Sequence, residues 1–174
     1  MLLSGKIVWP SLFVADEFGG KAHYGLSLLI PKGDKQMEEI GAVVDALIAE
    51  KCDGNSPADE NLCVKDCDDN EKSGEDFQGH YLIKIKSQSR PAVVDADVQP
   101  IIDPDEVRGG DYVNVTCDFF AWDFKGKQGI SCGLNNVQHV KKGEHVIGSS
   151  KTNASDDFQP IASPSGDTGN TSRF

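Results

Sequence analysis

Residues 111–140 read DYVNVTCDFFAWDFKGKQGISCGLNNVQHV, and this stretch decides the fold. In its first half, Val and Cys alternate with polar residues at every second position, which is the period of a strand with one buried face. The loop 123–128 contains Gly126, which suits a hairpin turn, and a second β-rich run follows it. We therefore predict two strands, 111–123 and 128–140, that pair as a hairpin.

The chain before this hairpin supplies the rest of a small barrel. Asp34 is placed as the N-cap of a helix whose apolar residues recur at helical spacing until Gly54. Short runs rich in Val, Ile, Phe and Tyr predict three more strands, near 3–9, 23–30 and 80–89. Within 80–86, alternation places Leu82, Lys84 and Lys86 on the solvent face. The predicted fold class is mainly β: a five-stranded OB-like barrel with one α-helix, spanning residues 1–147.

The negative charge of the chain is concentrated in one segment. Of the net charge of -11 over 174 residues, residues 53–76 carry -7, since they hold nine acidic residues and two lysines. Gly and Pro occur there without an apolar period, so we predict an acidic surface-loop insertion over 53–78. The rest of the chain is close to neutral, and a basic groove on one face is therefore compatible with the overall charge.

The ends of the chain and its cysteines restrict the class of protein. No run approaches the roughly 20 apolar residues that span a bilayer, and the start MLLSGKIVWP lacks the basic region of a secretory signal. We expect a cytoplasmic protein that makes no membrane contact, with five reduced cysteines. After Gly148 the composition turns to Ser, Thr, Asn and Gly, which predicts a disordered tail over 148–174.

Metal-binding and catalytic motifs are incomplete in this sequence. Cys63 and Cys67 have the spacing of a zinc pair, but no second pair completes a four-ligand site. Residues 66–70 resemble the start of a calcium loop, yet Glu71 stands where that loop needs Gly. A nucleophile elbow, a phosphate-binding Gly loop and an HExxH pair are all missing. We therefore expect no catalytic residue, no metal, no cofactor and no enzymatic activity.

Aromatic side chains beside cations are the most informative candidates for binding. Stacking on a nucleic-acid base contributes about 1–3 kcal/mol whatever the base, while Lys and Arg contact phosphates. The candidates from the strands and the hairpin turn are Phe120, Trp122, Phe124, Lys125, Lys127, Lys84, Lys86 and Arg90, and the second strand adds Lys21 and Tyr24.

Alternation leaves three of these aromatic placements open. Phe120 and Trp122 could instead cover the helix or a dimer interface, and Tyr24 has the parity of a core residue. Trp9 and Phe13 flank Pro10 at the end of the first strand, where an aromatic side chain at an edge could stack on a base, but ordinary packing is the expected role.

Three stretches together resemble a family of phage single-stranded-DNA-binding proteins. They are GGDYVNV (109–115), the aromatic run 119–122 and GISCGLNNVQHVKKGE (129–144), and the segments that end in Trp9-Pro10 and Ile30-Pro31 fit as well. The resemblance covers about residues 1–147. It implies an OB-like barrel that binds single-stranded DNA without sequence preference and without a cofactor, in the host cytoplasm during phage DNA replication or recombination.

The tail and the acidic segment suggest partners other than DNA. Asp156, Asp157, Phe158 and the terminal Phe174 are candidates for recruiting a phage polymerase, recombinase or nuclease, and a homodimer is a further possibility. One alternative function is an acidic protein-interaction module that imitates DNA or binds a basic host protein. Another is a metal-dependent nuclease or phosphatase that uses the aspartates of the acidic segment.

Overall fold

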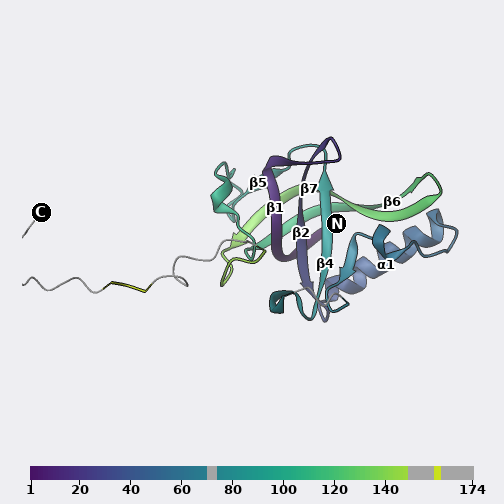
Figure 1. Ribbon diagram of the computed structural model, residues 1–174, viewed down its shortest axis with the longest axis horizontal. Helices are drawn as coiled ribbons and strands as arrows, with labels where there is room; N and C mark the ends of the chain where they lie inside the picture. Colours follow the sequence, from purple (N-terminus) through teal and green to yellow (C-terminus); the bar gives the residue numbers. More distant parts are fainter. Residues whose placement is uncertain (70–73, 149–158, 162–174) are drawn as a thin grey trace, which may run out of the picture.

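The computed structural model describes residues 1–69, 74–148 and 159–161 (Figure 1). Within these residues, seven strands, one α-helix and three short 3-10 helices follow one another: β1 (Leu2–Phe18), β2 (Lys21–Pro31), α1 (Lys35–Lys51), η1 (Asp59–Asn61), β3 (Val64–Asp66), η2 (Glu75–Phe77), β4 (His80–Ser87), β5 (Ala92–Val94), η3 (Pro104–Glu106), β6 (Tyr112–Phe124) and β7 (Lys127–Lys141).

Five of the strands close into a barrel. Their order is β4-β2-β1-β6-β7, and β4 returns to pair with β7 in parallel at Lys86 and Gly133. β3 continues the sheet beside β4, and β5 pairs in parallel with β7. The prediction of a mainly β, five-stranded OB-like barrel with one helix is confirmed.

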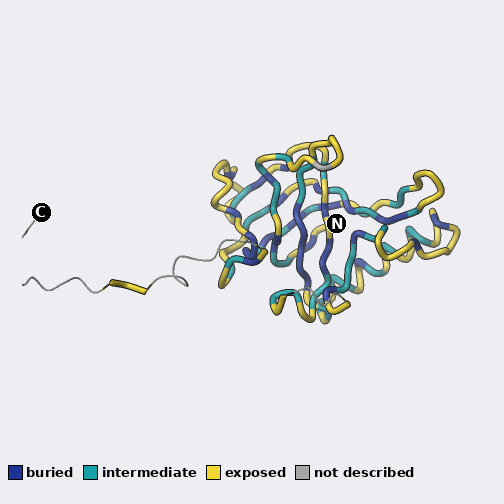
Figure 2. Tube along the Cα trace, in the orientation of Figure 1, coloured by how far each residue is buried: buried dark blue, intermediate teal, exposed yellow. Residues whose placement is uncertain are grey.

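The β6–β7 hairpin forms the longest ladder of the barrel. The two strands pair from the start of β6 to the turn, and the predicted alternation is confirmed where Val113, Val115 and Cys117 point into the core. Figure 2 shows buried residues along the barrel strands and exposed residues at the turns between them. Fully buried aliphatic side chains of several strands fill the interior, among them Leu3, Ile7, Leu28, Ile30, Ile83, Ile85 and Ile130.

The helix is the predicted one. Asp34 caps it by accepting a hydrogen bond from the Gln36 backbone N–H at 2.9 Å, and Gly54, with a positive φ of 77°, follows its end. Ile40 is buried in the barrel core, and the Gln36 amide hydrogen-bonds the backbone of Ser4 on β1. The helix lies beside the β6–β7 hairpin (Figure 1).

Residues 62–67 of the acidic segment join the sheet, whereas we predicted a surface loop over all of 53–78. Cys63 is buried in the barrel core, and its backbone lies between two barrel strands: its N–H donates to Ile130 O and its C=O accepts from Lys84 N, each at 2.9 Å. β3 then pairs with β4. A three-residue strand is too short to show a period, which is why composition alone indicated a loop.

A second, smaller apolar cluster depends on the same segment. Cys67 and Phe77 pack with Leu82 of β4, and Leu82 is therefore buried although alternation placed it on the solvent face.

The first strand is longer than predicted. β1 continues beyond the predicted strand 3–9 and bends at register shifts after Val8. Most of the predicted tail 148–174 lies outside the described residues.

Asp111 joins the start of β6 to the end of β7. Its buried carboxylate accepts hydrogen bonds from the backbone N–H groups of Arg108 and Gly143, both at 3.0 Å, and contacts His139 Nε2 at 2.9 Å and Lys142 Nζ at 3.4 Å. Burial alone would raise the pKa of Asp111, but these neighbours outweigh burial and hold the pKa below its ordinary value.

Replacing Asp111 with Asn should destabilise the barrel. Losing hydrogen bonds to a charged, buried acceptor costs about 1.5–3 kcal/mol of the free energy of unfolding. Because the pKa of the folded carboxyl is lowered, the wild-type advantage is complete above pH about 4, the ordinary value for Asp, and is lost as pH falls through the folded pKa. Urea unfolding of the wild type and of Asp111→Asn, at neutral and at acid pH, measures this difference in the free energy of unfolding. Asp45→Asn, at an exposed position of the helix, is the control. An equal loss at every pH would contradict the charge-based explanation.

Candidate nucleic-acid interface

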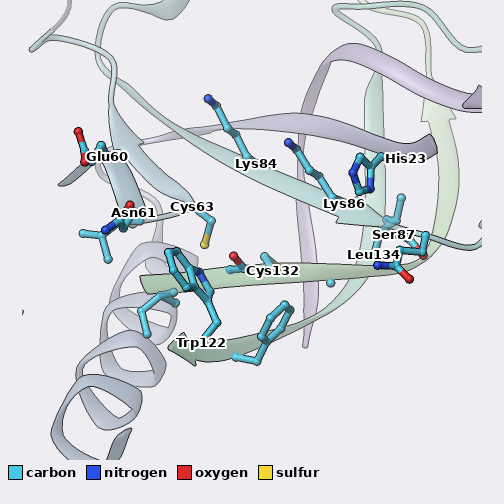
Figure 3. Close-up of a pocket in the computed structure, with 16 residues that line it drawn as sticks. His23, Glu60, Asn61, Cys63, Lys84, Lys86, Ser87, Trp122, Cys132 and Leu134 are labelled. Carbon is cyan, nitrogen blue, oxygen red and sulfur yellow. The ribbon is translucent and has the colours of Figure 1, made fainter. Parts of the chain in front are cut away.

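A hollow of about 640 Å³ lies where β4, β6 and β7 meet residues 60–63 of the acidic segment. Figure 3 shows Lys84 and Lys86 projecting side by side from β4, and Trp122 near Cys63 at the end of the hollow. Side chains predicted from four separate positions of the sequence therefore meet here: Lys84, Lys86, Phe120 and Trp122.

Phe120 and Trp122 face this hollow and not the helix. On β6 the alternate residues Phe119 and Ala121 pack against the barrel core, so Phe120 and Trp122 point to the opposite side. Phe120 is 48% exposed. Both rings therefore line the hollow, on the side of β6 opposite Phe119 and Ala121.

Gly129 of β7 makes room for the Trp122 ring. Gly129 pairs with Trp122, and a Cβ atom added there would come within 2.3 Å of the indole and 2.6 Å of the Asn61 carbonyl oxygen. At Gly133 an added Cβ would lie 3.7 Å from the Phe120 ring, which is ordinary contact. The Trp122 ring therefore lies directly on the β7 backbone, where a larger residue would displace it.

The cations of the hollow come from neighbouring strands. Lys84 and Lys86 are exposed because the residues between and before them, Ile85 and Ile83, point into the core. In the described part of the chain neither lysine makes an ion pair. Lys65 of β3 lies near Lys84, and burial together with the charge of Lys84 lowers its pKa.

Some of the acidic side chains around this surface are already paired. Lys32 binds the carboxylates of Asp66 and Asp68, each at 2.7 Å, and these contacts lower the pKa of both acids. His145 contacts Asp76 at 2.7 Å. Part of the negative charge of the acidic segment is thus paired with neighbouring cations. None of its described acidic residues forms an ion pair with Lys84 or Lys86.

Two further hollows continue the surface across β4. One, of about 380 Å³, shares His23, Lys84 and Lys86 with the first and adds Tyr24. The other, of about 670 Å³, shares Lys84 and lies against Val64 and Phe77. Tyr24 is half-buried and lines this surface. It is therefore not a core residue, although its position in the alternation allowed that placement. Lys84 lines all three hollows, which we refer to together as the β4 groove.

The other predicted residues lie away from the β4 groove. Phe124 and Lys125 are at the exposed tip of the β6–β7 hairpin with Lys127, and the Lys125 Nζ is 5.3 Å from the Phe124 ring centroid. Lys21 begins β2 beside the β1–β2 turn. The Arg90 guanidinium is 5.6 Å from the Phe13 ring. The tail candidates Asp156, Asp157, Phe158 and Phe174 lie outside the described residues.

Three residues that line this surface were not selected from the sequence. For Trp9, packing was preferred over stacking on a base, yet it is 50% exposed and lines two of the hollows. Lys65 was counted only within the acidic segment, and His23 formed no motif. The spacing of Lys65 from the exposed lysines of β4 carries no signal, since its position depends on the β3–β4 pairing.

The cysteines, the possible metal ligands and the helices were compared with what a metal site or a membrane span requires. Cys63 and Cys67 belong to different apolar clusters, and burial raises the pKa of the Cys63 thiol to about 11. Over residues 1–69 and 74–148, no three His, Cys, Asp or Glu side chains lie close enough to hold a metal ion. No helix among the described residues is both long and apolar enough to cross a membrane.

The barrel and its groove together define a class of protein. OB folds bind oligonucleotides or oligosaccharides on the face of their second and third strands and at the loops that join strands 1–2 and 4–5. In this barrel β2 and β4 are the second and third strands, and they carry Tyr24, Lys84 and Lys86. The chain is an OB-type barrel with its groove on that face.

Within this class, the chain belongs to the family of the ssDNA-binding protein of Enterobacter phage Enc34, whose family model matches residues 4–168. Protein p50 of Acyrthosiphon pisum secondary endosymbiont phage 1 is similar as well, with 30% identity over 157 residues that cover 82% of this chain and 83% of p50.

Solved structures of phage proteins share the fold. The C-terminal truncation of the Enc34 single-stranded DNA-binding protein has a TM-score of 0.71 at 21% identity, covering 81% of this chain and 84% of its own. The same protein in complex with ssDNA has a TM-score of 0.69 at 21% identity, covering 83% and 86%. The gp2.5 protein of bacteriophage T7 has a TM-score of 0.55 at 14% identity, covering 87% and 98%.

Replacing Gly129 with Ala should move the Trp122 ring and strain the adjacent Asn61 backbone. Overpacking of this kind costs about 1–3 kcal/mol of the free energy of unfolding. Gly133→Ala is the matched control, because the Cβ it adds meets no atom closer than 3.6 Å. Urea unfolding compares the two, and the emission of Trp122 in a Trp9→Phe background reports the ring. Equal stability of the two variants would contradict the close packing of Trp122 on Gly129.

Proposed function

We propose that this protein binds single-stranded DNA without sequence preference in the β4 groove, during phage DNA replication or recombination. The observation that carries the proposal is the meeting of Lys84 and Lys86 with Phe120 and Trp122 in one hollow of an OB-type barrel. The lysines would contact phosphates and the two rings would stack on bases. The family and the ssDNA complex of the Enc34 protein support this ligand class.

The hairpin-tip and turn residues extend the proposed interface. Lys21 lies beside the turn between strands 1 and 2, and Phe124, Lys125 and Lys127 lie at the turn between strands 4 and 5 of the OB barrel. These are the two loops with which OB folds add ligand contacts. Arg90 lies against the Phe13 ring, so it would contact the DNA only where the DNA extends beyond the groove.

Recruitment of a polymerase, recombinase or nuclease by the tail remains a prediction from sequence. The residues proposed for it, 156–158 and Phe174, are outside the described part of the chain. The acidic segment has a clearer role, because its residues 60–63 form one wall of the first hollow. We therefore favour a segment that shapes the DNA groove over a separate protein-interaction module.

Titration of labelled oligo-dT, oligo-rU and duplex DNA of equal length, at two salt concentrations, tests the function. Oligo-dT should bind with micromolar or tighter affinity that weakens as salt rises, and duplex should bind less well. Absence of binding to any single strand at low salt would contradict the proposal, and preferential binding of duplex would contradict the proposed ligand class.

Single substitutions locate the site. Lys84→Gln and Lys86→Gln should each lower the slope of log affinity against log salt by about 0.7, the value for one lost phosphate contact on a single strand. Phe120→Ala should weaken binding by about 1–3 kcal/mol. Lys35→Gln, at the exposed start of α1, is the matched control and should leave affinity and slope unchanged. Equal slopes in all lysine variants would place the phosphates elsewhere.

A further inference from the structure

Trp9 occupies an unusual backbone position. In the β1–β2 ladder Val8 pairs with Ser27 and Ser11 with Gly25, so Trp9 and Pro10 form a bulge opposite a single residue of β2. The φ angle of Trp9 is +49°, in the left-handed region that bulky side chains rarely adopt. Bulges and strained residues concentrate at functional sites, where they redirect a side chain.

The indole of Trp9 is fixed on one side and open on another. It stacks on the Phe77 ring with centroids 5.5 Å apart and planes 22° apart. The backbone at Gly148 approaches so closely that an added Cβ would lie 2.6 Å from the indole Nε1. Half of the residue's surface nevertheless stays exposed. A ring that only filled a gap in the core would be covered, and this one is held in place while it remains accessible.

Trp9 and Trp122 line different hollows of the β4 groove. Trp9 lines both the second and the third hollow, and Lys84 lines all three. The path between the two tryptophans therefore runs over exposed lysines of β4. This is the arrangement of two aromatic platforms along a cationic track, on which successive bases of a single strand can stack.

We propose that Trp9, supported by Phe77, is a second base-stacking platform of the β4 groove, an inference that rests on the proposed binding of single-stranded DNA. A strand that stacks on Phe120 and Trp122 continues over Lys86 and Lys84 and places a further base on the open side of Trp9.

The charges around Trp9 indicate what this platform contributes. Asp59, Asp66 and Asp69 line the hollow beside it, and Asp16 and Glu17 line the adjoining one. Carboxylates disfavour phosphate contacts, while stacking of a neutral base is much less affected. Trp9 therefore adds affinity through stacking alone, and its contribution is nearly independent of salt, in contrast to that of Lys84.

The two tryptophans of the chain, Trp9 and Trp122, allow each platform to be observed separately. Trp122→Phe leaves Trp9 as the emitting residue, and Trp9→Phe leaves Trp122. Both variants are titrated with oligo-dT of about 12 nucleotides, within the usual site size of an OB fold, while the anisotropy of a labelled oligonucleotide reports binding. The emission of Trp9 should be quenched by stacking with the same midpoint as the anisotropy change.

The outcomes separate this inference from the proposed function. Binding by anisotropy with unchanged Trp9 emission would overturn the second platform and leave DNA binding intact. No anisotropy change in the wild-type protein would contradict the proposed function itself.

Affinity measurements on Trp9 variants supply a second, independent readout. Trp9→Gly removes the ring and suits the positive φ, and it should weaken oligo-dT binding about 5- to 150-fold, the range for one lost stacking contact. The loss should be the same at low and high salt. Trp9→Phe should keep most of the affinity because it keeps a ring. If Trp9→Gly does not fold, the fluorescence titration still decides; if it folds and binds like the wild type, the inference is wrong.

Discussion

Backbone pairing between β6 and β7 is the interaction on which the rest of this structure depends. The ladder runs from the start of β6 to the hairpin turn, and β1 and β5 each pair with one of its strands. One face of β6 supplies the barrel core and the other presents Phe120 and Trp122. Because Gly129 of β7 has no side chain, the Trp122 ring can lie directly on that strand. The same register thus determines the core and the aromatic side of the groove.

The sequence predicts those parts of the molecule that depend on local periodicity. The alternation in β6, the apolar spacing and cap of α1, and the exposure of Lys84 and Lys86 are all local patterns, and the structure confirms them. That Lys84 and Phe120 would line one surface rested on placing each on the solvent side of its own strand; in the barrel, β7 lies between β4 and β6.

The remaining features depend on contacts between distant segments. β3 and Cys63 find their places only by pairing with strands that lie later in the chain, so composition indicated a loop. The exposure of Trp9 follows from a bulge and a positive φ, neither of which has a signature in a Trp-Pro dipeptide. Arg90 and Phe13 illustrate the opposite case, in which an exposed cation pairs with a ring of the protein itself.

Closure of the barrel has a consequence for how the protein responds to occupancy. β4 and β7 share one register pair, Lys86 with Gly133, and beyond it the backbone of Cys63 bridges the two strands. This seam is also the floor of the β4 groove, so a molecule that contacts both Lys84 and Trp122 spans it and binds only while it is closed. Occupancy would then favour the closed barrel by mass action, and the slowest amide exchange at the seam would track the concentration of free ligand. Ligand binding in the groove and closure of the barrel at the β4–β7 seam are therefore thermodynamically linked.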